Sequence, residues 1–357
     1  MKFIKILLIL FVLNSCKKND VKDIGIEVYR FDKELFTIND SNFADKWRTW
    51  GSELDFVHQY YFVIHEQMTL DTDSVIKSNV IDFISHPDVL RFKQLIDDNF
   101  ENLDKTSNSF NKAFVEYNNY FPDSTVPKRI VTLPFDGVGI DVYNDNLLIG
   151  LNKYLGEAHP YFNSIDSYKR ERMNKKFIVA DGLEYWITST FLEYNQGNHF
   201  LDELIYKGKI MYTIYQCMPD SPLEDIFRFS EEELQWCEKH EQNIWNEILK
   251  MDVMYESDEL SYVSFFHDSP FTKGMPKESP GRLGYFVGYK IIESYMKEND
   301  ISLKELMKNT NSQEILLQSK YIPGEKDQES WFKKYWWVFF IFICFLGYFT
   351  YNNYVKK

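Results

Sequence analysis

The chain has 357 residues, and its 54 acidic and 40 basic side chains give a formal net charge of −14. This charge argues against a nucleic-acid-binding protein, because such proteins carry basic surfaces that neutralise phosphates. Hydrophobic residues make up 44% of the sequence and aromatic residues 17%. That composition is typical of a folded globular protein and excludes a disordered one.

The N-terminus has the pattern of a bacterial lipoprotein signal. Two lysines precede an apolar run over residues 6–13, which is too short to cross a bilayer, and Leu13-Asn14-Ser15-Cys16 follows it. We predict that the signal peptide 1–15 is removed, that Cys16 is lipidated, and that residues 16–26 form a tether. Several buried acyl chains then hold the protein on a membrane. The alternative is an ordinary secretory signal with an incidental cysteine.

The C-terminus carries a second apolar segment. Residues 335–351 are almost wholly apolar and lie between two lysine pairs, with tryptophans at one end and tyrosines at the other. This pattern predicts a transmembrane helix, although a buried or monotopic helix is the alternative. A spanning helix belongs in an inner membrane, whereas Lys17 in place of an aspartate favours outer-membrane sorting. The sequence therefore predicts a periplasm-facing body and leaves the choice of membrane open.

Between these ends the pattern predicts an α+β protein that is mainly α, folded as a single domain over residues 27–326. Helical spacing of apolar residues predicts a series of helices before and after a short β-rich stretch. That stretch predicts a small antiparallel sheet with strands 129–133, 137–143 and 147–151. The predicted helices are 47–64, 87–100, 110–120, 179–192, 200–217, 231–249, 285–296 and 303–308.

Only two cysteines, Cys217 and Cys237, lie in the predicted body. They are consistent with one disulfide in a periplasm or with two buried free thiols. The seven histidines include no pair at i, i+4, and His65-Glu66 lacks the second histidine of a zinc-protease motif. The sequence thus predicts neither a metal nor another cofactor.

One acidic pair lies on an otherwise apolar predicted helix. Asp202, Glu203 and Tyr206 are neighbours by helical spacing, and Gly208 permits close approach of another element. The acids form either a buried polar network or favourable charges in a first helical turn.

The lipoprotein signal and the blocks Ile149–Gly156, Asp202–Lys209 and Pro280–Tyr289 resemble the gliding-motility lipoprotein family GldB of Bacteroidetes. The resemblance implies a cell-envelope lipoprotein that supports gliding and the associated type IX secretion apparatus, with other envelope proteins as partners. The GldB family itself resembles predicted zincin-like zinc proteases. On that comparison Asp202-Glu203-Leu204-Ile205-Tyr206 stands where His-Glu-x-x-His is expected, so both metal histidines are absent.

The leading hypothesis is therefore a non-catalytic, zincin-like scaffold anchored by lipid at Cys16, with Asp202, Glu203 and Tyr206 as a degenerate site. Without the two histidines, zinc hydrolysis loses its electrophile and its activated water. One alternative is a membrane-anchored metallopeptidase-like hydrolase with an atypical site. Another is a periplasmic chaperone or carrier that holds an apolar ligand among the many aromatic side chains.

Overall fold

The computed structural model describes residues 24–54, 57–65, 68, 73–134 and 139–324. The predicted signal peptide, Cys16 and the apolar segment 335–351 lie outside these residues, so the predictions made for them stay predictions. Within the described ranges, no helix has both the length and the apolar character needed to cross a membrane.

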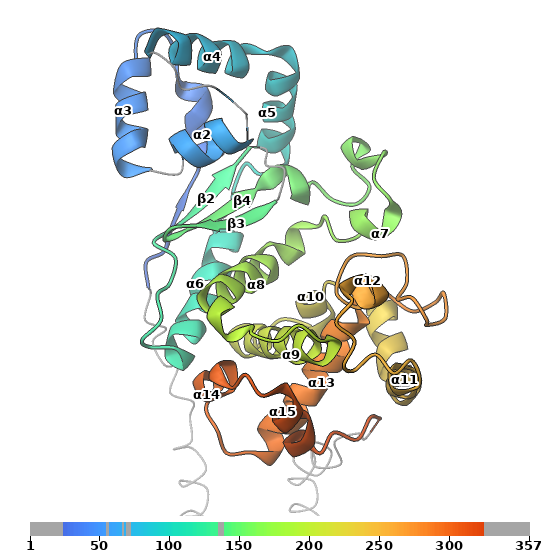
Figure 1. Cartoon of the computed structure of the whole chain (residues 1–357). Coiled ribbons are helices and arrows are strands. Elements are labelled where there is room, and N and C mark those ends of the chain that lie inside the picture. The colour runs from blue at the N-terminus through green and yellow to red at the C-terminus, as the bar shows by residue number, and fades with distance from the viewer. Residues whose placement is uncertain (1–23, 55–56, 66–67, 69–72, 135–138, 325–357) are drawn as a thin grey trace, which may run out of the picture.

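A four-stranded sheet lies in the middle of the molecule (Figure 1). Its strands are β1 (Glu27–Tyr29), β2 (Arg129–Leu133), β3 (Ile140–Tyr143) and β4 (Asn146–Gly150), in the spatial order β1-β2-β4-β3. The α+β prediction, mainly α with a small sheet, is confirmed.

The pairing of the strands corrects the antiparallel prediction in part. The β3–β4 hairpin is antiparallel, but β1 pairs with β2 and β2 pairs with β4 in parallel. The chain leaves β2, forms the edge strand β3, and turns back at Asn144 to place β4 beside β2. Because β4 lies between β2 and β3, only the hairpin keeps the antiparallel arrangement. Strand β1 was missed because its three residues pair with a strand about a hundred positions away.

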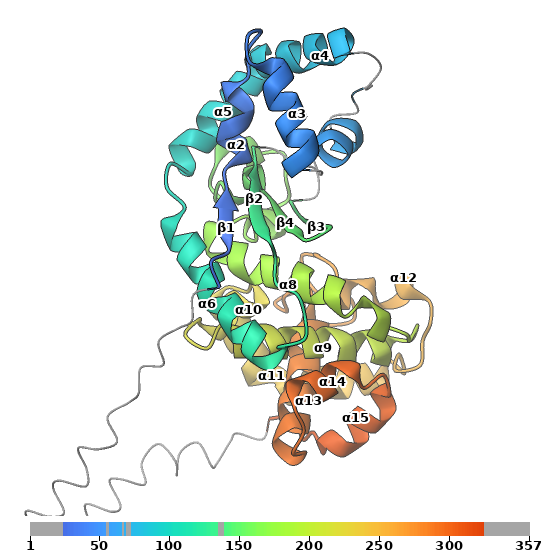
Figure 2. The same ribbon diagram turned by 90° about the vertical axis from the view of Figure 1, so that its left-hand side faces the viewer.

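The two faces of the sheet pack against two hydrophobic cores, since alternate residues of a strand point to opposite faces. Ile130 and Leu147 belong to one core, whereas Val131 and Leu148 belong to the other. The smaller core contains the first helices of the chain (Figure 2). These elements are α2 (Phe31–Glu34), η1 (Leu35–Thr37), α3 (Phe43–Glu53), η2 (Val57–His65) and α4 (Asp73–Ser85).

The larger core contains most of the remaining helices, and its long helices other than α5 are drawn below the sheet in Figure 1. Its long helices are α5 (Pro87–Asn99), α6 (Asp104–Tyr120), α8 (Ile178–Thr190), α9 (Phe200–Cys217), α11 (Glu231–Lys250) and α13 (Leu283–Glu298). Shorter helices connect them: α7 (Ser167–Arg170), α10 (Leu223–Phe227), α12 (Glu259–Tyr262), α14 (Leu303–Lys308), α15 (Ser312–Ser319), η3 (Leu151–Tyr154), η4 (Pro160–Phe162), η5 (Lys175–Phe177), η6 (Leu192–Tyr194) and η7 (Val263–Phe265).

Helices α9 and α13 touch backbone to backbone where they cross. A Cβ atom built on Gly208 would lie 2.3 Å from the Gly288 carbonyl oxygen, and one built on Gly288 would lie 2.2 Å from the Leu204 carbonyl oxygen. Only glycine fits at either position. The sequence prediction that Gly208 admits another element is therefore confirmed, and Gly288 is its partner.

Several helix boundaries follow from side chains that cap the backbone. A capping box begins α11: Glu233 N–H donates to Ser230 Oγ, and Ser230 N–H donates to the Glu233 carboxylate. Ser302 caps α14 in the same way. The predicted helix 47–64 is instead two elements, because α3 ends at Glu53 and η2 begins at Val57 with π-helical hydrogen bonding.

Cys217 lies in α9 and Cys237 in α11, and both are buried free thiols. Burial raises the pKa of each thiol well above its usual value. Of the two alternatives left by the sequence, the structure has the free thiols, and both are held in their unreactive protonated form.

Candidate functional site

The three residues predicted on α9 serve different local roles. Asp202 Oδ2 accepts a hydrogen bond of 3.1 Å from the His199 backbone N–H and caps the helix. Glu203 lies 3.7 Å from the Lys207 ammonium, one helical turn away. Tyr206 is 4% exposed, and its hydroxyl donates to the Thr188 carbonyl at 3.4 Å.

Asp202 and Tyr206 border a crevice of about 10 Å³, which Glu203 does not line. Such a volume holds about one water molecule. In the part of the chain that the structure describes, no three His, Cys, Asp or Glu side chains are grouped so as to hold a metal ion. The prediction of a degenerate zincin-like site at Asp202, Glu203 and Tyr206 stays a prediction.

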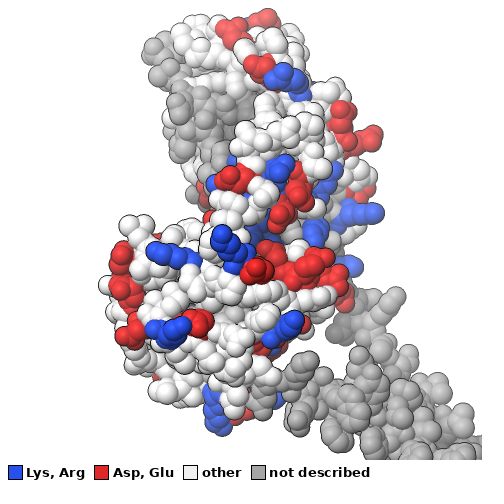
Figure 3. Space-filling model, turned by 90° about the vertical axis from the view of Figure 1, so that its right-hand side faces the viewer, with Lys and Arg blue, Asp and Glu red and all other residues white. Residues whose placement is uncertain are grey.

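A much larger pocket, of about 390 Å³, lies beside helix α8. Five cationic and three acidic side chains line it: Lys153, Lys169, Arg172, Arg228 and Arg282, with Asp181, Glu184 and Asp268. The lining is therefore cationic by two charges, although the whole chain carries −14. Positive and negative side chains lie interleaved at the waist of the molecule, between the sheet and the helical layer (Figure 3).

Helix α8 supplies two of these acids from one face. Asp181 and Glu184 are three residues apart, so their side chains lie on the same side of the helix. Both bind Arg228, whose side chain is 2% exposed: its Nε donates to Asp181 Oδ1 at 2.6 Å and one terminal nitrogen donates to Glu184 Oε2 at 2.5 Å. The same guanidinium also donates to the backbone carbonyls of Ala180 and Ile226.

Two tyrosines complete the hydrogen bonding of this acidic pair. Tyr154 donates to Asp181 Oδ2 at 2.8 Å, and Tyr285 donates to Glu184 Oε1 at 3.1 Å. Burial alone would raise the pKa of Glu184, but the charges of Arg228, Arg282 and nearby Lys207 lower it to about 2. Glu184 is therefore a fixed anion at neutral pH.

Two more arginines lie around Asp268 at the other side of the pocket. Arg172 Nε is 2.9 Å from Asp268 Oδ1, and the nearest nitrogen of Arg282 is 3.9 Å from the same oxygen. Burial, followed by the like charge of Arg282, lowers the pKa of Arg172 to about 10. The guanidinium carbon of Arg282 lies 4.1 Å from the centre of the Tyr285 ring, as in a cation–π contact.

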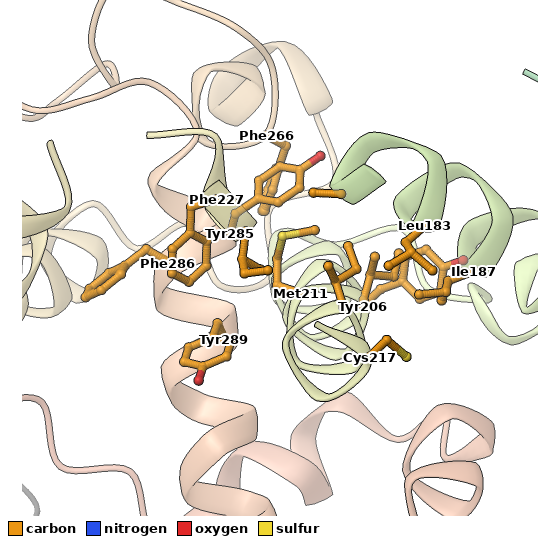
Figure 4. Close-up of a cluster of buried hydrophobic side chains, with 14 of the residues drawn as sticks. Leu183, Ile187, Tyr206, Met211, Cys217, Phe227, Phe266, Tyr285, Phe286 and Tyr289 are labelled. Carbon is orange, nitrogen blue, oxygen red and sulfur yellow. The ribbon is translucent and has the colours of Figure 1, made fainter. Parts of the chain in front are cut away.

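The floor of the pocket adjoins the larger hydrophobic core. Phe266 and Tyr285 line the pocket, and Met211 of α9 lies beneath them among the buried side chains (Figure 4). The sulfur of Met211 lies 3.6 Å from a terminal nitrogen of Arg228, so the charged cluster is in direct contact with the hydrophobic core. The charged cluster is thus built on the core, and its positions are set by the packing of α8, α9 and α13.

This arrangement favours electrostatic binding over proton transfer. A general base works best when its pKa is near the working pH, whereas Glu184 has a pKa of about 2. Asp181 is held by an arginine and a tyrosine together. The lining has two more cationic than acidic side chains, and this excess suits an anionic ligand.

Comparison with known families assigns the chain. The family model described as gliding motility protein GldB matches residues 14–323. The chain belongs to the GldB family. It is therefore a gliding-motility-associated protein, and membership in GldB indicates a location in the cell envelope. No curated protein and no solved structure matches the chain.

The GldB resemblance seen in the sequence is thus confirmed, while the further similarity to zinc proteases stays a prediction. The structure adds that the first long helix after the sheet is α8, which packs on strand β3, and not α9. Sequence reasoning missed Asp181 and Glu184, although two acids three residues apart on a mostly apolar helix are a usable signal. Arg282 lies within the block Pro280–Tyr289, which contributed only to the family resemblance.

Proposed function

We propose that this GldB-family protein is a non-catalytic, lipid-anchored envelope protein that supports gliding and the associated type IX secretion apparatus by binding other envelope proteins. The observation that carries the proposal is the family match, which runs from the predicted lipidation site at Cys16 through the end of the folded body. The body faces the periplasm, and the anchor is the acyl group on Cys16.

The chemistry of the pocket supports a non-catalytic role. Its two α8 carboxylates form close ion pairs with Arg228, and the pKa of Glu184 is lowered to about 2, far from the near-neutral value of a general base. Charged side chains dominate the lining, which gives no support to an apolar-ligand carrier. The metallopeptidase-like alternative would need a metal-activated water and a base of near-neutral pKa.

The anchor is tested by replacing Cys16 with serine. Cells that express Cys16→Ser should incorporate no labelled palmitate into the protein and should accumulate the uncleaved precursor, while the parent is labelled and processed. We expect the variant to restore gliding poorly in a strain that lacks the parent chain. Equal labelling of both proteins would refute lipid anchoring.

The non-catalytic role is tested separately with Glu203→Gln, which keeps the shape of a half-buried side chain on α9. The strain should glide normally, because loss of an essential general base would reduce a rate by roughly 10²–10⁴-fold. Stoichiometric zinc in the purified parent, together with a folded but non-gliding Glu203→Gln strain, would favour the hydrolase instead.

A further inference from the structure

Arg282 is a nearly buried cation that forms no close ion pair with any carboxylate of the described residues. Its side chain is 10% exposed, and the closest carboxylate oxygens, on Glu184 and Asp268, lie 3.8 and 3.9 Å away. Both distances exceed a hydrogen bond. Its guanidinium contacts the Tyr285 side chain through a hydrogen bond and a cation–π contact, but no carboxylate of the described residues lies within hydrogen-bond distance of it. We propose that the pocket beside α8 binds a carboxylate-bearing ligand and that Arg282 receives the carboxylate.

The neighbouring Arg228 shows what a structural arginine in this pocket looks like. Its guanidinium binds two carboxylates and two backbone carbonyls, so no donor pair is left for a ligand. Arg228 therefore positions α8, whereas Arg282 lines the same pocket with its nearest carboxylate oxygens, among the described residues, beyond hydrogen-bond distance. A planar carboxylate matches a guanidinium with two parallel hydrogen bonds.

The backbone holds Arg282 in a conformation that few residues adopt. Its φ of 63° lies in the left-handed region, which disfavours a side chain with a Cβ atom. Its N–H donates to the Ser264 carbonyl at 3.0 Å, and the preceding Pro280 carbonyl accepts from buried Thr272. A Cβ atom on Gly281 would lie 2.4 Å from the Ser269 carbonyl oxygen, so the loop has no room to shift. Arg282 is thus fixed before any ligand binds.

The charges of the pocket favour an anionic ligand. Five cations outnumber three carboxylates in the lining, which leaves an excess that a ligand can neutralise. The like charges of Arg172 and Arg282 lie on either side of Asp268, and an anion beside them would reduce their repulsion. A phosphate monoester, which carries about −1.5 to −2, is also attracted by this excess, so inorganic phosphate is the competing ligand in the test.

The size and walls of the pocket indicate that the carboxylate belongs to an organic molecule. A volume of about 390 Å³ lies within the range of small-molecule sites. Tyr285 stacks on the Arg282 guanidinium, while Tyr185 and Phe266 add aromatic walls. These rings suit the apolar body of a small acid or of a peptide C-terminus.

The proposal is tested by calorimetric titration of the full chain in detergent with benzoylglycine, a mimic of a peptide C-terminus, and with its neutral amide. We expect saturable one-to-one binding of the acid and binding of the amide that is at least about tenfold weaker. Acetate tests whether the pocket recognises only the carboxylate or also the rest of the ligand. If acetate binds as tightly as benzoylglycine, the ligand is a bare small acid. If acetate binds more weakly, the ligand has an organic or peptide body. Tighter binding of inorganic phosphate than of any carboxylate would overturn the proposal.

Variants locate the binding group. Arg282→Gln should weaken benzoylglycine binding by about tenfold to a hundredfold, the usual loss of a charge-assisted pair. Arg48→Gln removes the same charge from an exposed helix position and should leave binding unchanged. Unchanged binding by folded Arg282→Gln, or no saturable binding of any carboxylate below about 10 mM, refutes the site.

A second variant keeps the proposal testable if Arg282→Gln fails to fold. Asp268 is 42% exposed, and Asp268→Asn removes a carboxylate that competes for Arg282. We expect this variant to bind benzoylglycine several-fold more tightly than the parent does. Equal or weaker binding would contradict the assignment of Arg282 as the receiving cation.

Discussion

Replacement of Glu184 by glutamine measures how strongly the arginines hold α8. The pKa of this carboxyl is about 2 in the folded protein against an ordinary 4.5, because Arg228, Arg282 and Lys207 outweigh the effect of burial. A difference of this size corresponds to about 3 kcal/mol of stability at neutral pH, at about 1.4 kcal/mol per pKa unit. Glutamine keeps the shape and a hydrogen-bonding oxygen, so the charge is the main loss.

The pH dependence follows from the direction of the shift. A carboxyl whose pKa is lowered by folding stabilises the protein above its unfolded pKa, and this contribution is lost as the pH falls toward the folded pKa. The difference between parent and Glu184→Gln should therefore fall from about 3 kcal/mol at pH 7 to about 1.5 kcal/mol at pH 3. Urea unfolding of the full chain in detergent, followed by the fluorescence of its 8 tryptophans, gives both values.

A matched control separates this charge from acid effects elsewhere. Glu238 is exposed on α11, and Glu238→Gln should change stability by less than about 0.5 kcal/mol at either pH. A loss for Glu184→Gln that stays the same from pH 7 to pH 3 would show that shape, and not charge, causes it. In that case the ion pairs with Arg228 would not stabilise the fold as reasoned.

Two further predictions concern the core. Gly288→Ala should lower the free energy of unfolding in urea by at least about 3 kcal/mol, because its Cβ would meet a backbone oxygen at 2.2 Å. Gly182→Ala is the control and should cost clearly less, because its Cβ meets the edge of the Phe110 ring, which can move. Equal losses in the two variants would contradict backbone contact as the cause. Burial lowers the pKa of Lys209 to about 8, so between about pH 8 and 10.5 the unfolded state binds more protons and the stability of the parent should rise with pH. Lys209→Met should lose this rise, whereas the exposed control Lys239→Met should keep it. A rise of the same size in Lys209→Met would refute that assignment.

Much of the helical layer could be predicted from local signals. The bounds of α9 and α14 agree with the sequence prediction, because an apolar stripe and a capping residue define each. Helix α4 was missed although its buried residues Ile76, Val80 and Ile84 recur at helical spacing, which is a usable signal. The short strand β1 has no local signal at all, because its partner Arg129–Leu133 is contributed from far along the chain.

The pocket was harder to predict than the fold for a physical reason. Asp181, Arg228 and Arg282 come from three separate segments, and the spacing of residues in a single sequence gives no sign that they meet. The α9 acids drew attention because Asp202 and Glu203 are adjacent, yet adjacency on a helix places side chains on different faces. Spacing of three residues, as between Asp181 and Glu184, is the pattern that directs two carboxylates to one partner.

The energetics of the cluster explain why so many charges are buried at one point. A buried ion pair rarely stabilises a protein more than well-packed apolar residues would, because desolvation offsets the attraction. Arg228 with Asp181 and Glu184 nevertheless fixes the face of α8 that borders the pocket. Arg282 lies 3.8 Å from Glu184, forms no such tight pair, and lines the cavity. The ion pairs of Arg228 thus hold α8 at the wall of the pocket, and Arg282 lines the same pocket as the cation that we propose binds the ligand.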